Sequence, residues 1–132
     1  MTARRAGIAV IAAALLATAA TAASAAGPRS VRILVVGNVN QEQTLGSGTF
    51  TSTIAGVADH GTWVARKNPT TFVDNFRFVG RRGTFKASDF NLRWTFSGGT
   101  KAYARLTGKG TEKEASLGFT GFRVVWRGTA TR

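Results

Sequence analysis

Large apolar side chains recur at every second position in several stretches of this chain, and this spacing constrains its fold more than any other feature. Apolar and polar residues alternate along Phe90–Phe96, and the same alternation returns along Phe122–Arg127. Successive side chains of an extended strand point to opposite faces, so each stretch predicts a strand with one core face and one wet face. After residue 27 no window has the three-and-four spacing of an amphipathic helix. The sequence therefore predicts an all-β fold.

Turn residues divide the chain into about seven or eight expected strands. Strands are expected in residues 30–37, 49–57, 62–66, 72–79, 84–96, 102–106 and 115–131. Turns are expected at residues 59–61, 80–83, 98–99 and 108–110, which contain glycine or aspartate. Short strands joined in sequence order favour a meander, and closing a meander removes its exposed edges. We expect a single antiparallel up-and-down β-barrel of about eight strands, with a two-sheet β-sandwich as the alternative.

The N-terminal residues have the three-part layout of a secretory signal. Arg4 and Arg5 precede an apolar run at residues 8–20, and small residues follow at 23–26. This layout predicts a signal-peptide helix over residues 1–26. The apolar run is short and rich in alanine, which makes a poor membrane span, and we expect no stable transmembrane span after cleavage. A retained anchor is the alternative.

Cleavage is expected after Ala25 or Ala26, because small residues precede both positions. The barrel domain would then span residues 27–132 and be secreted or held in the cell envelope. The adjacent arginines suggest twin-arginine export, but residues 6–8 do not complete that motif, which leaves the export route open. The chain has no cysteine, so the domain depends on its core, for which nine Phe and three Trp supply the rings.

The charge of the chain is strongly positive. Eighteen Lys and Arg oppose six acids, and because two of the basic residues and none of the acids lie in residues 1–26, residues 27–132 keep a net charge of +10. Anionic cell-wall polymers and lipids are therefore candidate partners, and a solvated surface without a partner is the alternative. No nucleic-acid partner is expected, because the strand pattern hides the rings that would stack on bases.

The residue types argue against most catalytic chemistry. One histidine and no cysteine disfavour a metal centre and Cys/His nucleophiles, and His60 is interpreted as an exposed turn residue. Glu112 and Glu114 share a face of an extended chain and are interpreted as surface carboxylates that balance Lys109 and Lys113. We expect no catalytic residue, no metal ligand and no cofactor.

Asp74 is the acid with the most informative position. In a regular strand it shares a face with Phe72, Phe76 and Phe78. If that face lines a barrel, the carboxylate points into an apolar interior, where burial would raise its pKa and make it a candidate ligand anchor. The alternative is a rim position, paired with an arginine such as Arg77 or Arg93. The candidate ligand-binding residues are Asp74, Phe76, Phe78 and Trp94.

Two segments carry a family resemblance. Phe78–Phe85 and the glycine-bounded stretch Gly98–Gly110, which begins Gly-Gly-Thr-Lys-Ala-Tyr, resemble small exported actinobacterial proteins of unassigned function. Those proteins are similar to the allene oxide cyclase and dirigent barrel superfamily. The resemblance implies a closed eight-strand barrel that holds an apolar ligand. Outside the glycine turn no catalytic pattern of that superfamily is present.

The sequence thus leads to three hypotheses about function. The first is an exported barrel that binds a small apolar ligand without catalysis. The second is charge-mediated association with anionic cell-wall polymers or lipids. The third is an isomerase-like enzyme of the allene oxide cyclase type.

Overall fold

The computed structural model describes residues 27–116 and 118–132, so the predicted signal peptide and its cleavage site lie outside the described residues. The described chain forms eight strands and one short 3-10 helix. They are β1 (Arg29–Val39), β2 (Leu45–Ile54), β3 (Val57–Lys67), β4 (Asp74–Gly80), β5 (Thr84–Phe90), β6 (Arg93–Gly99), η1 (Lys101–Tyr103), β7 (Thr107–Ser116) and β8 (Gly121–Thr131).

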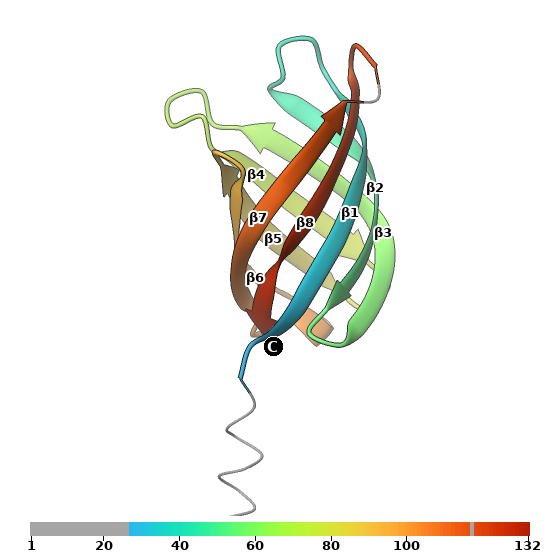
Figure 1. Cartoon of the computed structure of the whole chain (residues 1–132), viewed down its shortest axis with the longest axis vertical. Coiled ribbons are helices and arrows are strands. Elements are labelled where there is room, and N and C mark those ends of the chain that lie inside the picture. The colour runs from blue at the N-terminus through green and yellow to red at the C-terminus, as the bar shows by residue number, and fades with distance from the viewer. Residues whose placement is uncertain (1–26, 117) are drawn as a thin grey trace, which may run out of the picture.

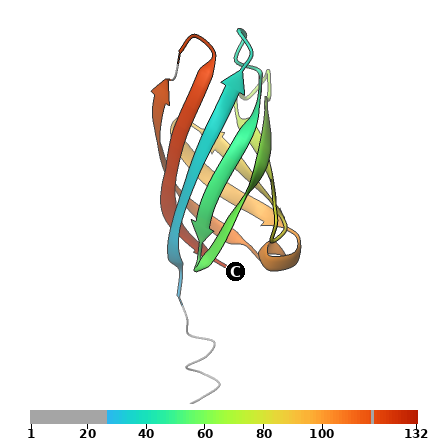
Figure 2. The same cartoon turned by 90° about the vertical axis from the view of Figure 1, so that its right-hand side faces the viewer.

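Each strand pairs antiparallel with the next, and β8 pairs with β1 to close the sheet into a barrel. The prediction of an up-and-down barrel is confirmed, and the sandwich alternative is wrong. Figures 1 and 2 show the strands tilted around a common axis. The described chain begins and ends at one end of the barrel, the lower end in Figure 1, with the β2–β3 and β4–β5 turns and η1. We name this the closed end, and the opposite end, with the β1–β2, β3–β4, β5–β6 and β7–β8 connections, the open end.

The interior is filled by aromatic rings from alternate positions. Trp63, Trp94 and Trp126 are at most 1% exposed, and the rings of Trp94 and Trp126 stack with centroids 5.4 Å apart. A Cβ atom at Gly110 would collide with the indole of Trp94, so this strand position has to lack a side chain. The indole N–H of Trp94 donates to the backbone oxygen of Thr111 at 3.0 Å. The period-two pattern therefore predicted correctly that Trp94 and Trp126 share one interior.

Two expected strands each contain a turn: residues 115–131 cover the end of β7 and all of β8, and residues 84–96 cover β5 and β6. The prediction of a single strand over residues 84–96 is wrong, because β5 ends at Phe90 and β6 begins at Arg93. Asn91 and Leu92 form a two-residue turn with φ values of 54° and 63°. As a result Phe90 and Leu92 are 56% and 51% exposed, while Trp94 stays inside. The alternation of residue types runs through this turn unchanged, so the pattern alone does not reveal it.

Two expected turns are strand interiors. The predicted turn at residues 59–61 lies within β3, and the chain turns instead at Ala55 and Gly56, with φ values of 47° and 84°. His60 is exposed, but on a strand. The predicted turn at residues 108–110 lies within β7, where glycine makes room for the Trp94 ring.

Two other segments also differ from the prediction. The expected strand at residues 102–106 overlaps η1, and Tyr103 is fully buried. Phe72, expected on the same strand face as Asp74, lies in the β3–β4 connection with a φ of 62° and is 62% exposed. The face shared by Asp74 and the following phenylalanines therefore begins at Asp74 itself.

A buried carboxylate ties the closed end together. Asp59, 7% exposed, accepts hydrogen bonds from the Tyr103 hydroxyl at 2.7 Å and from the backbone N–H groups of Arg81 and Arg82 at 2.8 and 3.1 Å. The backbone N–H of His60 is a further donor at 2.8 Å. Burial alone would raise the pKa of Asp59, but these donors outweigh it and hold the pKa below its ordinary value. One side chain thus fastens the β4–β5 turn and η1 to β3.

Replacement of Tyr103 by phenylalanine is expected to lower the free energy of unfolding at neutral pH by about 1.5–3 kcal/mol, because a hydrogen bond to a charged group is lost. The folded-state pKa of Asp59 is lowered, so its stabilisation is present above the ordinary aspartate pKa and disappears as the pH falls through the folded value. The difference in free energy of unfolding between the wild type and Tyr103→Phe should therefore become smaller at acidic pH. Urea denaturation at neutral and acidic pH measures both effects, and equal stability at neutral pH would contradict this role for Tyr103.

Candidate ligand-binding site

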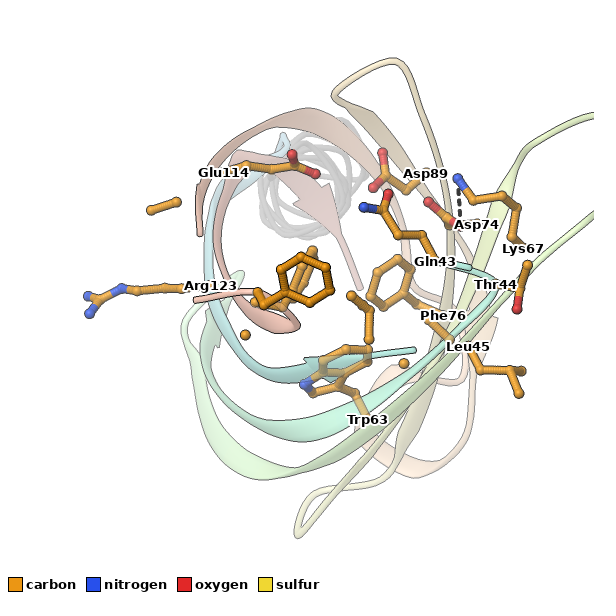
Figure 3. Close-up of a pocket in the computed structure, with 17 residues that line it drawn as sticks. Gln43, Thr44, Leu45, Trp63, Lys67, Asp74, Phe76, Asp89, Glu114 and Arg123 are labelled. Carbon is orange, nitrogen blue, oxygen red and sulfur yellow. Dashed lines mark ion pairs between the residues drawn. The ribbon is translucent and has the colours of Figure 1, made fainter. Parts of the chain in front are cut away.

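The barrel interior opens to solvent at the open end in a cavity of about 230 Å³. Its walls come from the open-end residues of β1 to β5, β7 and β8 and from the β1–β2 and β7–β8 connections. Figure 3 shows this end of the barrel with the lining side chains. Deeper positions are occupied by large rings, so the cavity is a cup above a packed core and not a channel through the barrel.

The cavity has an aromatic wall and an acidic wall. Trp63 lies with its ring centroid 5.4 Å from that of Phe76 and 5.6 Å from that of Phe122, and all three rings line the cavity. Figure 3 places Asp74, Asp89 and Glu114 away from Trp63, on the other side. The site therefore offers a ligand an apolar surface on one side and hydrogen-bond acceptors on the other.

The strand register explains why the acids lie inside. Asp74 on β4 is directly opposite Asp89 on β5, and Glu112 on β7 is directly opposite the buried Trp126 on β8. Residues directly opposite in an antiparallel pair share a face, so these side chains point inward. The acids on inward positions of the described strands are Asp59, Asp74, Asp89, Glu112 and Glu114, which leaves Glu42 in an exposed loop. The interpretation of Glu112 as a surface carboxylate is therefore wrong, and Glu114, although exposed, lines the cavity.

Asp89 and Glu112 form a coupled pair. Asp89 is 5% exposed and lines the cavity, and its Oδ1 atom and the Oε2 atom of Glu112 are buried without a hydrogen-bond partner. Burial raises the pKa of Asp89, and burial together with the hydrogen bond and negative charge of Asp89 raises the pKa of Glu112 to about 9. The indole N–H of Trp126 counters this rise without reaching full hydrogen-bond geometry. Because the pKa of Glu112 lies at about 9, the pair holds a proton at neutral pH.

Asp74 lies nearer the rim. Its Oδ1 is 3.7 Å from Nζ of Lys67, and both side chains are about one-third exposed (34% and 27%). Burial raises the pKa of Asp74, and the charge of Lys67 only partly offsets this. Asp74 therefore has features of both predicted alternatives: its carboxyl points inward with a raised pKa, and it forms an ion pair at the rim. The partner is Lys67, and the expected partners Arg77 and Arg93 point outward and are exposed.

The four predicted binding residues fall into two groups. Asp74 and Phe76 line the cavity. Phe78 and Trp94 lie below it in the packed core, at 0% and 1% exposed. The ring of Phe78 stacks on that of Phe85 with centroids 4.6 Å apart, which leaves a ligand no access to its face.

Sequence reasoning missed Asp89, Glu112 and Trp63. A signal for Asp89 was present, since it continues the alternation of Phe85 and Ala87 on β5, but assigning residues 84–96 to one strand hid it. Had the turn been placed at Asn91, the inward face of β5 would have included Asp89. No local signal indicates that Glu112 approaches Asp89, because the two residues lie on strands separated by β6.

The pair makes stability depend on pH. Because the folded-state pKa values of Glu112 and Asp89 are raised, the folded protein holds more protons than the unfolded chain between about pH 5 and about pH 9, so stability should fall as pH rises through this range. Glu112→Gln should make the melting temperature fall less over this range than in the wild type. Glu42→Gln, a change in an exposed loop, is the control and should keep the wild-type slope. Thermal unfolding followed by circular dichroism measures the slopes, and identical slopes for all three proteins would contradict the assignment.

Over residues 27–116 and 118–132, no helix combines the length and apolarity needed to cross a membrane. In the same residues no three His, Asp or Glu side chains are grouped closely enough to hold a metal ion. Comparison of the chain with protein-family models, with curated proteins and with solved structures finds no match in any of the three.

Proposed function

We propose that this protein is a non-enzymatic binding protein that holds a small apolar ligand in the open end of its barrel. The observation that carries this proposal is the cavity of about 230 Å³ lined by Trp63, Phe76 and Phe122. Eight-stranded barrels are wide enough to enclose one small ligand or to be filled by their own side chains. Here the rings fill the closed end, whereas at the open end they line free space. An apolar wall with a few polar groups opposite is the usual composition of a small-molecule site.

Export from the cytoplasm and kinship with the allene oxide cyclase and dirigent barrels remain part of this proposal. The N-terminal signal pattern supports the first, and the glycine segment Gly98–Gly110 supports the second. An isomerase-like activity is the competing hypothesis, in which the proton shared by Asp89 and Glu112 would be transferred to a ligand. Binding without turnover is favoured because Asp89 is the only fully buried acid that lines the cavity in the described part of the chain, and no second proton-transfer group faces it from the aromatic wall.

Filling the cavity should weaken binding of the ligand. Ala65 lines the cavity, whereas its neighbour Val64 is 53% exposed on the outer face of β3. With naphthylmethanol as a neutral two-ring probe, Ala65→Phe is expected to weaken binding by about tenfold or more, and the matched control Val64→Phe to leave it unchanged. Isothermal titration calorimetry measures the affinities.

No binding of the probe to the wild-type protein, or equal binding by both variants, would contradict the proposal. Native mass spectrometry of protein purified from its own culture medium adds an independent readout. It would detect a retained small molecule and show whether the chain begins near residue 27.

The outer surface favours the second candidate function, association with anionic cell-wall polymers or lipids. The outward positions of β6, β7, β8 and β1 carry exposed cations and no acid. These cations are Arg32, Arg93, Lys109, Lys113, Arg123 and Arg127, which we name the basic face. Arg32 and Arg127 are directly opposite each other across the β1–β8 pair, so their like charges are adjacent. An anionic polymer or headgroup would relieve that repulsion.

The basic face predicts a side-specific interaction. Replacing Arg32, Arg123 and Arg127 with glutamine should weaken binding to vesicles that contain phosphatidylglycerol, and added salt should weaken binding of the wild type. The control makes the same charge change at the outward residues Arg66, Arg77 and Lys86 of β3, β4 and β5. Vesicle co-sedimentation measures both. Equal loss in the two triple variants would show that net charge alone acts and would overturn a role for this face.

A further inference from the structure

The polar wall of the cavity is negatively charged, so it does not suit the anionic partners that the basic outer surface would attract. At the open end Lys67 is the one cation on an inward strand position, and it is paired with Asp74 at 3.7 Å. Arg123 on β8 also borders the cavity, but its side chain extends away from the centre (Figure 3). What remains on the wall is Asp89, which is coupled to Glu112 outside the lining, together with Glu114 on β7. The cavity therefore has an acidic lining, whereas the outer surface of the barrel is basic. A carboxylate or phosphate ligand would meet like charge here, in a partly desolvated site where such repulsion is strong.

An unpartnered acceptor points to the missing ligand group. Asp89 lines the cavity although its side chain is only 5% exposed. Its Oδ1 atom accepts no hydrogen bond from an N–H or hydroxyl group of the chain. Buried acceptors without a donor are rare because each one costs about 1–3 kcal/mol. The contrast with Asp59 is direct, since that buried aspartate has donors for both carboxylate oxygens from its own chain. Apart from the proton held with Glu112, no group of the described chain donates to this oxygen, and a ligand donor would fill that place.

We propose that the pocket selects a ligand with a protonated amine on an apolar, preferably aromatic, body. This inference rests on the proposed function and specifies its ligand class. The ammonium group would donate to the carboxylate of Asp89, and the apolar body would lie against Trp63, Phe76 and Phe122. An ammonium group offers three donors and no acceptor, which suits a wall of carboxylates. The facing rings add a favourable surface for a cation and its apolar stem.

Amine binding should also release a proton. The charged groups around the Asp89–Glu112 pair are Asp74 on β4, Lys67 on β3 and Glu114 on β7, and the Trp126 indole faces Glu112 from β8. A positive ligand charge beside Asp89 favours ionisation of both members of the pair. The shared proton should then leave on binding, whereas a neutral ligand of the same shape should leave it in place.

Three probes of equal shape test the inference: naphthylmethylamine, naphthylmethanol and naphthoate. In calorimetry at about pH 7 the amine is expected to bind about tenfold or more tightly than the alcohol, and naphthoate more weakly than either. Titrations in two buffers of different ionisation enthalpy should show proton release with the amine alone. Asp89→Asn should remove the preference for the amine over the alcohol, and the alcohol binding that remains shows that the variant is folded. Glu42→Gln makes the same charge change in an exposed loop and should alter nothing.

Glu112→Gln separates the two acids. It removes the shared proton and keeps the Asp89 carboxylate, so amine binding should persist without proton release. If the alcohol binds and the amine binds no tighter, the amine inference is wrong and the proposed function stands. If naphthoate binds tightest, the inference is also wrong. If none of the three probes binds, the proposed function fails together with it.

Discussion

Closure of β8 onto β1 is the constraint on which the rest of the structure depends. In an open sheet both faces can reach water, but in a closed barrel every second side chain is enclosed. The alternation along each strand then becomes a separation of charge. The strand cations other than Lys67 face solvent or lie at the rims, and the strand acids face inward. A chain of high positive charge thereby acquires an acidic interior.

Each end of the barrel holds a buried aspartate, and the two aspartates differ in their hydrogen-bond donors and in the direction of their pKa shifts. At the closed end Asp59 is held by the Tyr103 hydroxyl and three backbone N–H groups, and its pKa is lowered. At the open end Asp89 has an oxygen without a donor, and its pKa is raised. The first carboxylate stabilises the fold, and the second is the group that we propose contacts a ligand. The four donors lower the pKa of Asp59 against the effect of burial, whereas burial and the negative charges of Asp74 and Glu114 raise the pKa of Asp89.

The two proposed interactions use different parts of the molecule, with Arg123 bordering both. The basic face lies on the outside of β6, β7, β8 and β1, and the cavity opens at the end of the barrel. Attachment of the barrel wall to an anionic polymer would leave that opening accessible. The outer surface can therefore attract anions while the cavity favours a cation. Exposed charges are screened by salt beyond about a Debye length, whereas buried charges are screened less.

The sequence alone determined the fold class, the closure expected of a strand meander, the burial of Trp94 and Trp126 and the inward direction of Asp74, because these follow from a period of two within one strand. The tertiary structure decided where that period shifts, as at the Asn91–Leu92 turn, and which inward residues meet. Asp89 and Glu112 come together only through pairing and tilt around the barrel. Alternation is a local property that one strand specifies, whereas contacts across the interior depend on the register of every strand between them.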